Sequence, residues 1–352
     1  MNRWDLDSRS QAILRQAVHT FIAFGEPVGS RTLAKVNPQR LSPATIRNIM
    51  SDLEDRGFLH QPHISAGRLP TDKGYRFYVS TLVKGAGLSE SERKMIGASL
   101  RGAEKDLESL VQQTSHLLSH MTDMISFVIG PDFERSILRH VDFVRLASHR
   151  ILVVLVSQTG QVYNRAIEIP EDLPGEELQE CARYLEAEFR GFTLVEAREA
   201  LLLRMREMRA IYNRLVKNAL TLGKAAFGED MPTDVYLEGT SRMLSKPEFK
   251  SDIDRARQLL TILEQKGRLV RILNACLEGD RLQIVIGSET RVPDFKGISL
   301  IAARYGMQNR ELGALGIMGP SRMEYAKLIS VVDYIARSLS EAISQKGSGT
   351  AN

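Results

Sequence analysis

The sequence contains few of the residues that mark secreted, metal-binding or membrane proteins. Only two of its 352 residues are cysteines, Cys181 and Cys276, and no CxxC or Cys/His cluster suggests a disulfide framework or a zinc site. The longest unbroken apolar run, ILVVLV (151–156), is far shorter than the about 20 residues that cross a bilayer. The opening MNRWDLDSRS lacks the apolar stretch of a secretory signal. We therefore expect a cytoplasmic protein without metal or membrane contact.

Sequence motifs of common enzymes are also missing. The chain has no GxGxxG fingerprint, no P-loop, no HExxH and no GxSxG. Gly313, Gly316 and Gly319 are regularly spaced but do not open a phosphate-binding helix, so we interpret them as packing glycines. We expect no enzyme activity and no cofactor.

Positive charge is concentrated at the start of the chain. The net charge is +4, and residues 1–84 hold 12 Lys and Arg against 7 Asp and Glu, so this segment contains the whole excess. A small basic domain attached to a neutral remainder is typical of a protein whose basic domain binds nucleic acid. The competing explanation is that the uneven charge distribution arose by chance.

The same segment, residues 1–84, has the pattern of a winged helix-turn-helix domain. Apolar spacing predicts a helix over 7–24, a short helix after Ser30 and a third helix with Ser42 as N-cap and Pro43 in its first turn. Two short extended pieces, 58–61 and 69–70, follow with a turn at 65–67. Three short helices and a hairpin predict a recognition helix beside a wing.

Candidate DNA contacts are the polar side chains that such a domain exposes. Arg47 and Asn48 suit base edges in a major groove, and Arg31 and Lys73 suit phosphates. Arg68 on the wing suits a minor groove. The remaining candidates are Thr45, Ser51, His63 and Ser65. For any one of them, a solvated surface position is the competing interpretation.

The rest of the chain alternates between helical and strand patterns. One long helix is predicted over 89–124, a second over 176–189 and an amphipathic final helix after 321, followed by a disordered tail at 346–352. Strands are predicted at 141–146, 151–156, 162–169, 282–286, 298–304 and 311–318. Strands, helices and then strands predict an α+β domain with a helical insertion.

The predicted insertion carries a regular apolar seam in steps of four and three. An intramolecular core and a homodimer interface are both compatible with this seam. The candidate dimerisation residues are Leu201, Met205, Met208, Tyr212, Leu215 and Leu222.

Several segments resemble one family. LSPATIRNIMSDLEDRGFLHQPHISAGRLPTDKGYRFYV (41–79), PVGSRTL (27–33), VYLEGTSRMLSKPEF (235–249) and GALGIMGPSRMEYAKLISVVDYI (313–335) resemble the bacterial heat-inducible transcription repressor HrcA. The resemblance covers essentially the whole chain. It adds Ser42 to the candidate DNA contacts, while Ile49 departs from the Glu of many family members and joins the apolar stripe.

The resemblance implies three domains in an α+β multidomain fold. These are a winged helix (1–84), a GAF-like α+β domain (89–192 and 268–345) and an inserted, mainly helical dimerisation domain (193–267). It also implies a homodimer that binds the CIRCE inverted repeat of double-stranded DNA, represses chaperonin and dnaK-type operons, and is kept active by the chaperonin GroEL. A regulator controlled by a small ligand in the GAF-like domain is the alternative.

Overall fold

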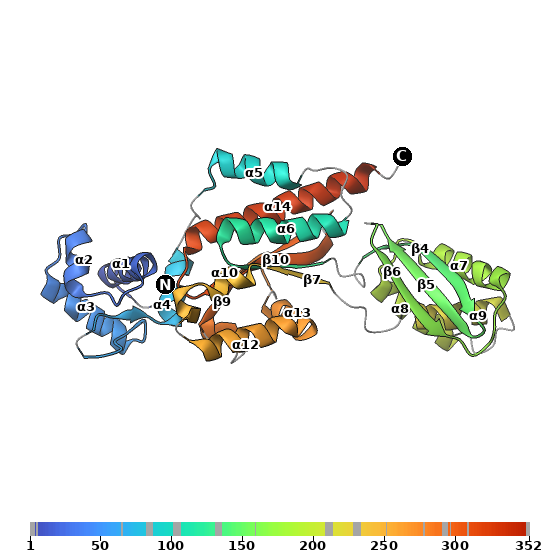
Figure 1. Cartoon of the computed structure of the whole chain (residues 1–352), viewed down its shortest axis with the longest axis horizontal. Coiled ribbons are helices and arrows are strands. Elements are labelled where there is room, and N and C mark those ends of the chain that lie inside the picture. The colour runs from blue at the N-terminus through green and yellow to red at the C-terminus, as the bar shows by residue number, and fades with distance from the viewer. Residues whose placement is uncertain are drawn as a thin grey trace.

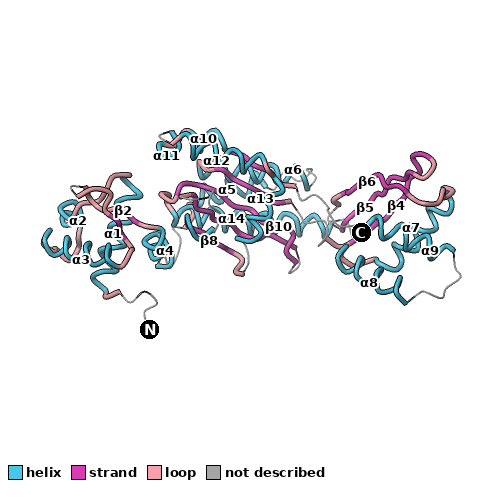
Figure 2. Tube along the Cα trace, turned by 90° about the horizontal axis from the view of Figure 1, so that it is seen from below, coloured by secondary structure: helices cyan, strands magenta, loops and turns pink. Residues whose placement is uncertain are grey.

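The computed structural model shows three bodies in a row (Figure 1). We call them the N-terminal domain (6–81), the central domain (87–130 and 234–349) and the inserted domain (136–227), and Figure 2 shows the same order from below. The structure describes residues 4, 6–64, 66–81, 87–100, 107–130, 136–158, 160–207, 214–227, 234–250, 252–276, 279–290, 295, 297–307 and 310–349. Helix and sheet are both well represented, as the predicted α+β class requires.

The N-terminal domain contains three helices, a two-stranded hairpin and a fourth helix. These elements are α1 (Ser8–Phe24), α2 (Ser30–Val36), α3 (Pro43–Asp55), β1 (Leu59–His60), β2 (Leu69–Pro70) and α4 (Asp72–Thr81). The predicted helices and hairpin are confirmed, whereas α4 was not predicted. Trp4, Phe58 and Phe77 meet edge to face in the core, with ring centroids 6.1–6.3 Å apart.

A five-stranded antiparallel sheet forms the centre of the central domain. Its strands follow the order β7-β3-β10-β9-β8. Their bounds are β3 (Ile125–Ile129), β7 (Val235–Glu238), β8 (Leu282–Ile286), β9 (Ile298–Met307) and β10 (Arg310–Pro320). The three predicted C-terminal strands are confirmed, and β3 and β7 are additional.

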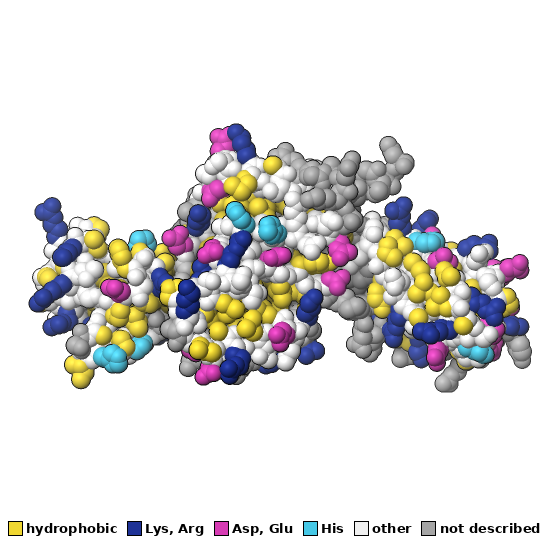
Figure 3. Space-filling view, viewed as in Figure 1, with side chains coloured by type: hydrophobic (Ala, Val, Ile, Leu, Met, Phe, Trp, Pro, Cys, Tyr) yellow, Lys and Arg dark blue, Asp and Glu magenta, His cyan; other side chains and the backbone are white. Residues whose placement is uncertain are grey.

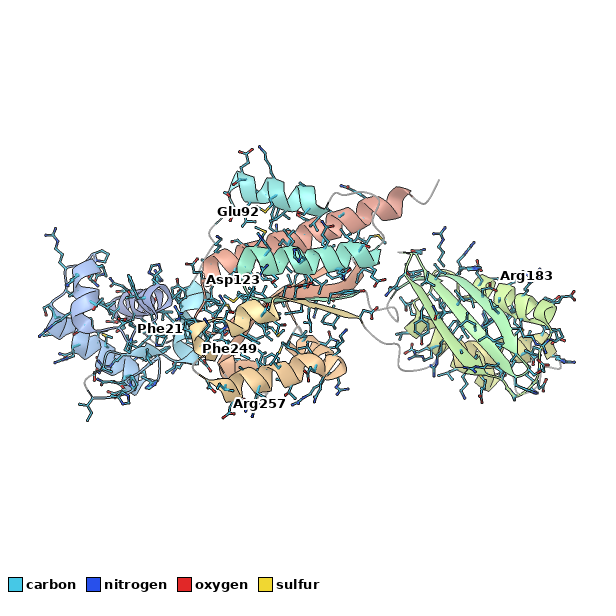
Figure 4. All side chains as sticks on the ribbon, viewed as in Figure 1. Phe21, Glu92, Asp123, Arg183, Phe249 and Arg257 are labelled. Carbon is cyan, nitrogen blue, oxygen red and sulfur yellow. The ribbon has the colours of Figure 1, made fainter. Side chains whose placement is uncertain are left out.

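Helices cover both faces of this sheet (Figure 1). One face packs on α5 (Glu90–Leu100), α6 (Leu107–Thr122) and α14 (Tyr325–Gly349), whose buried side chains continue into the core of the N-terminal domain. The other face packs on α10 (Thr240–Leu244), α11 (Pro247–Lys250), α12 (Ile253–Glu264) and α13 (Lys266–Cys276). Phe249, labelled in Figure 4, is 2% exposed in that second layer.

The inserted domain has a three-stranded sheet with helices on one face. Its elements are β4 (Leu138–Ala147), β5 (Arg150–Ser157), β6 (Val162–Glu168), α7 (Gly175–Phe189), α8 (Leu194–Glu207) and α9 (Arg214–Ala226). The three predicted strands and the predicted helix α7 are confirmed, with β5 in the centre. Cys181 is buried in this core, which raises the pKa of its thiol to about 11, so the thiol stays protonated.

The structure places the boundaries of the insertion differently from the prediction. Strands β4–β6 and helix α7 were assigned to the GAF-like domain, but they form a separate sheet and a separate core with α8 and α9. Helices α10–α12 were assigned to the insertion, but they pack on the central sheet together with α13. The sequence pattern identifies each strand, but strand partners depend on contacts between distant segments.

The apolar seam belongs to the core of its own domain. Leu201 and Leu222 are each 1% exposed, and Met205 and Leu215 pack against the same cluster. This corrects the predicted dimer interface in favour of the intramolecular alternative, because α8 and α9 need the seam to cover the sheet. Met208 and Tyr212 lie outside the described residues.

Two helix predictions also change. The long helix over 89–124 is described as α5 and α6, with β3 directly after α6. A capping box begins α5, where Ser89 N–H donates to the carboxylate of Glu92 at 2.8 Å (Glu92 is labelled in Figure 4). The predicted disordered tail is helical as far as Gly349, which ends α14, and the last three residues lie outside the described range. No described helix is long and apolar enough to span a bilayer.

Candidate nucleic-acid interface

A groove of about 820 Å³ runs along one side of the N-terminal domain. Its walls come from the start of α2, the outer face of α3 and the loop between β1 and β2, which we call the hairpin loop (61–68). The lining residues include Ser30, Arg31, Pro43, Ala44, Arg47, Asn48, Ser51, Gln61, Ile64 and Arg68. Figure 3 shows Lys and Arg side chains gathered along the edge of the domain that carries α2 and α3.

Helix α3 begins as the sequence predicts. Ser42 is the N-cap, and its Oγ accepts a hydrogen bond from Thr45 N–H at 3.1 Å and lies 2.9 Å from Thr45 Oγ1. Ile46, Met50 and Leu53 are buried on the inner face, which turns the opposite face outward. The structural role of Ser42 is therefore to cap the helix, and its hydroxyl is already hydrogen-bonded to Thr45.

The outer face of α3 presents the predicted base-reading side chains. Arg47, Asn48 and Thr45 are exposed and Ser51 is half-buried, and three of these four line the groove. Arg31 on α2 is exposed on the same groove. Within the described part of the chain, neither Arg31 nor Arg47 has an acidic partner, so both guanidinium groups face solvent.

Arg68 does not project from the hairpin loop as predicted. Its Nε donates to Glu54 Oε2 on α3 at 2.7 Å, and its side chain is only 14% exposed. Glu54 Oε1 also accepts from Gln61 N–H at 2.9 Å, and these bonds hold the pKa of the Glu54 carboxyl below its usual value, with the Arg68 bond as the largest cause. Arg68 is thus a residue that fixes the hairpin loop to α3.

Lys73 is likewise engaged inside the protein. Its Nζ donates to the Arg56 carbonyl oxygen at 2.8 Å, just after α3, and lies 4.3 Å from the centre of the Phe58 ring. Because this ammonium group binds the carbonyl end of α3, it lies away from the start of the helix that lines the groove. We correct the prediction that Lys73 is a free phosphate contact.

The hairpin loop closes against the start of α2. Val28 and Arg68 exchange two backbone hydrogen bonds of 2.9 Å each. A Cβ on Gly67 would lie 2.5 Å from the Val28 carbonyl carbon, so only glycine allows this close approach. His63 is exposed on the loop, whereas Ser65 lies outside the described residues.

Polar contacts fix the N-terminal domain to the central domain. Arg76 Nε donates to Glu289 Oε1 at 2.7 Å, and Ser288 N–H donates to Asp72 Oδ2 at 2.8 Å. Arg322 Nη1 donates to the Ile22 carbonyl at 3.1 Å while its Nε binds Glu248 at 2.8 Å. These contacts engage Arg76 within the protein. They set the direction in which the groove faces.

Comparison with known proteins identifies the family. Residues 108–329 match the family described as HrcA protein C terminal domain. A heat-inducible transcription repressor HrcA from Syntrophobacter fumaroxidans is 38% identical over 97% of this chain and 99% of its own length. The chain belongs to the HrcA family. A heat-inducible transcription repressor HrcA from Geobacter sulfurreducens is 39% identical over 96% of this chain and 98% of its own length.

A solved structure shares the fold of this HrcA family member. It is titled a crystal structure of a hypothetical protein at 2.2 Å resolution, with a TM-score of 0.64, 23% identity, and coverage of 97% of this chain and 99% of that chain. At this identity the likeness concerns the fold alone.

The sequence did not indicate the loop-fixing role of Glu54. Its only signal is an acidic residue late in α3 with an arginine on the hairpin loop, and many surface pairs share that pattern. The pairing became visible only when the hairpin was folded back along the helix.

Proposed function

We propose that the protein is a heat-inducible transcription repressor that binds double-stranded DNA through the groove of its N-terminal domain. The N-terminal domain acts as a winged helix-turn-helix, with α3 as recognition helix and the hairpin loop as wing. Arg47 and Asn48 read base edges, and Arg31 binds a phosphate.

One observation carries this proposal. Arg47 and Asn48, for which the described residues provide no ion-pair or hydrogen-bond partner, project from the exposed face of a capped helix. The hairpin loop beside them is held to that helix by one ion pair and one backbone hydrogen bond to Glu54. The combination places base-reading groups on a rigid support, which specific DNA recognition requires. The relatives, named transcription repressors, support the same function.

Gel-shift titration of Arg47→Ala tests the base-reading role. We expect affinity for an operator to fall by about 1–3 kcal/mol while binding to random DNA changes less. Arg15→Ala is the matched control, because Arg15 is exposed on α1 outside the groove. Equal losses on operator and random DNA would contradict the assignment.

We further propose that the operator is the CIRCE inverted repeat upstream of chaperonin and dnaK-type operons. An inverted repeat requires two copies of the groove, so this proposal includes a homodimer. The matching probe is a duplex carrying the repeat, compared with a duplex in which one half-site is scrambled. Binding of equal strength to both duplexes would argue against a dimeric reader.

The open face of the three-stranded sheet is our proposed dimer interface. Alternate residues of β5 are half-buried on this face, and register pairs Leu152 with Val144 and Val156 with Val162. Val144 is 44% exposed and Val162 58% exposed. Figure 3 shows the apolar surface on this side of the domain. A second copy related by a two-fold axis would cover this face with the same apolar surface.

Val154→Asp tests the interface, because Val154 lies at the middle of the open face between Asp142 and Asn164. A carboxylate at this position would lie opposite Asp142 of its own chain and under the second copy, and burying two like charges is costly, so light scattering should show monomers. Leu203→Asp is the control, since Leu203 is 56% exposed on α8, outside the sheet. A dimer of unchanged stability in Val154→Asp would exclude this face.

GroEL dependence is the last part of the proposal. Ile129 on β3 pairs with Ala314 on β10, so the central sheet cannot form until the chain between them is in place. Such distant pairing is slow, and the exposed strands of intermediates are recognised by chaperones. We expect the active fraction after refolding, titrated with operator DNA, to rise with GroEL and to fall again when an unfolded competitor is added. Equal fractions in all three samples would contradict the dependence.

A ligand sensor in the central domain, which we interpret as GAF-like, is less well supported. The layer between the sheet and α12–α13 is filled by side chains, among them Phe127, Phe249 and Phe295, each at most 2% exposed. We therefore interpret the central domain as a structural platform.

A further inference from the structure

Ile64 is an unusual residue at the tip of the hairpin loop. Its side chain is 99% exposed, the highest value for any large apolar side chain in the described ranges. A single exposed isoleucine needs no explanation on most surfaces. Ile64, however, lines the same groove as Arg47, Asn48 and Arg31.

The loop around Ile64 is held in a defined shape. The Gln61 side-chain amide donates to the Ile64 carbonyl at 3.0 Å and to the Ala66 carbonyl at 2.8 Å. Ala66 N–H also donates to the His63 carbonyl at 2.9 Å. Because Gln61 N–H binds Glu54 on α3, the tip is connected to the recognition helix through two hydrogen bonds. The position of Ile64 relative to α3 is therefore set before DNA binds.

The loop presents no described cation at its tip. Arg68 is bound to Glu54, and within the described part of the loop the remaining exposed side chains are those of His63 and Ile64. A tip that meets DNA mainly with an aliphatic group is suited to the sugars and base edges that line a minor groove. Apolar side chains that enter this groove pack between sugars or base steps.

We propose that Ile64 enters the minor groove beside the recognition helix and makes an apolar contact that favours A·T pairs there. This inference rests on the proposed DNA-binding function. The selectivity follows from the groove floor, because the exocyclic amino group of guanine projects into the minor groove and A·T pairs lack it. The contact neutralises no phosphate. It therefore strengthens binding without changing how the affinity depends on salt concentration.

The test compares Ile64→Ala with the wild-type protein on a duplex carrying the CIRCE repeat with A·T pairs where the loop would contact the groove. We expect about 5- to 30-fold weaker binding, the loss that removing most of a buried isoleucine side chain produces. The slope of log affinity against log salt should not change. Arg31→Ala is the comparison variant, for which the slope should fall by about one.

Two controls separate the apolar contact from general damage. Val36→Ala removes a 61% exposed aliphatic side chain of the same domain outside this groove, and it should bind as the wild type does. Thermal unfolding of Ile64→Ala should match the wild type, since an exposed side chain stabilises nothing in the free protein.

Changes of base pair in the duplex locate the contact. Replacing the A·T pairs with G·C should weaken the wild type but not Ile64→Ala, and inosine·C pairs, which lack the amino group, should restore wild-type binding. Unchanged affinity of Ile64→Ala, a changed salt slope, or equal weakening of both proteins by G·C would overturn the inference. If the wild type itself does not distinguish the repeat from scrambled DNA, the proposed function fails and this inference with it; specific binding with no effect of Ile64→Ala refutes the inference alone.

Discussion

Substitution of Glu54 by alanine should loosen the hairpin loop without disturbing the core. The change removes the acceptors of two hydrogen bonds, one from Arg68 Nε at 2.7 Å and one from Gln61 N–H at 2.9 Å. Arg68 is left 14% exposed without its carboxylate partner. The apolar core under α3 keeps all of its side chains.

The magnitude follows from the exposure of the pair. A hydrogen bond to a charged group contributes about 1.5–3 kcal/mol when it is shielded from water, and an exposed ion pair about 0–1 kcal/mol. Glu54 is 30% exposed, so water screens part of the attraction. We expect Glu54→Ala to lower the free energy of unfolding of the N-terminal domain by about 1–2 kcal/mol.

The single tryptophan of the chain provides the assay. Trp4 packs against Phe58 and Phe77, so its fluorescence during a urea titration reports unfolding of the N-terminal domain. Asp55→Ala is the matched control, because Asp55 is exposed on the same helix, and its effect should stay within about 0.5 kcal/mol.

A double-mutant cycle decides whether the ion pair is responsible. Glu54→Ala, Arg68→Ala and the double variant should give a coupling energy of at least about 0.5 kcal/mol. Operator affinity should fall in both single variants with the salt slope preserved, because neither side chain binds phosphate. A coupling energy near zero would contradict the proposed role of the ion pair, since it would mean that the two side chains stabilise the domain independently.

Three further outcomes follow from the same contacts. The Glu54 carboxyl has a pKa below its usual 4.5, so its contribution is complete above about pH 4.5 and is lost as pH falls through the lowered pKa; the difference in Tm between wild type and Glu54→Ala should shrink on acidification. Gly67→Ala forces a Cβ against Val28. It should weaken operator binding and also lower the urea midpoint of the transition followed by Trp4 fluorescence, whereas normal binding would show that the loop can shift. Arg322→Ala removes the bonds to α1 and to Glu248, so the unfolding transition followed by Trp4 fluorescence should separate from the transition of the whole chain followed by circular dichroism; coincident transitions would show that the apolar contacts suffice.

Much of the N-terminal domain was predictable from local sequence. Ser42 and Pro43 set the start of α3, and the stripe of Ile46, Met50 and Leu53 fixed which face is buried. Exposure of Arg47 and Asn48 then follows from helical geometry alone. The strands of the other two domains were also found, because the alternation of apolar residues is a local signal.

Most helices and strands, the residues that face outward on α3 and the family resemblance were therefore predictable from the order of the amino acids. Three features required the folded chain: β4–β6 form their own sheet, the Leu201–Leu222 seam is internal, and Arg68 and Lys73 are bound within the protein. The two sets of features differ in the distance along the chain over which the responsible interactions act. Backbone geometry and periodicity act over a few residues, whereas strand partners and the partner of a charged side chain depend on segments that meet only after folding.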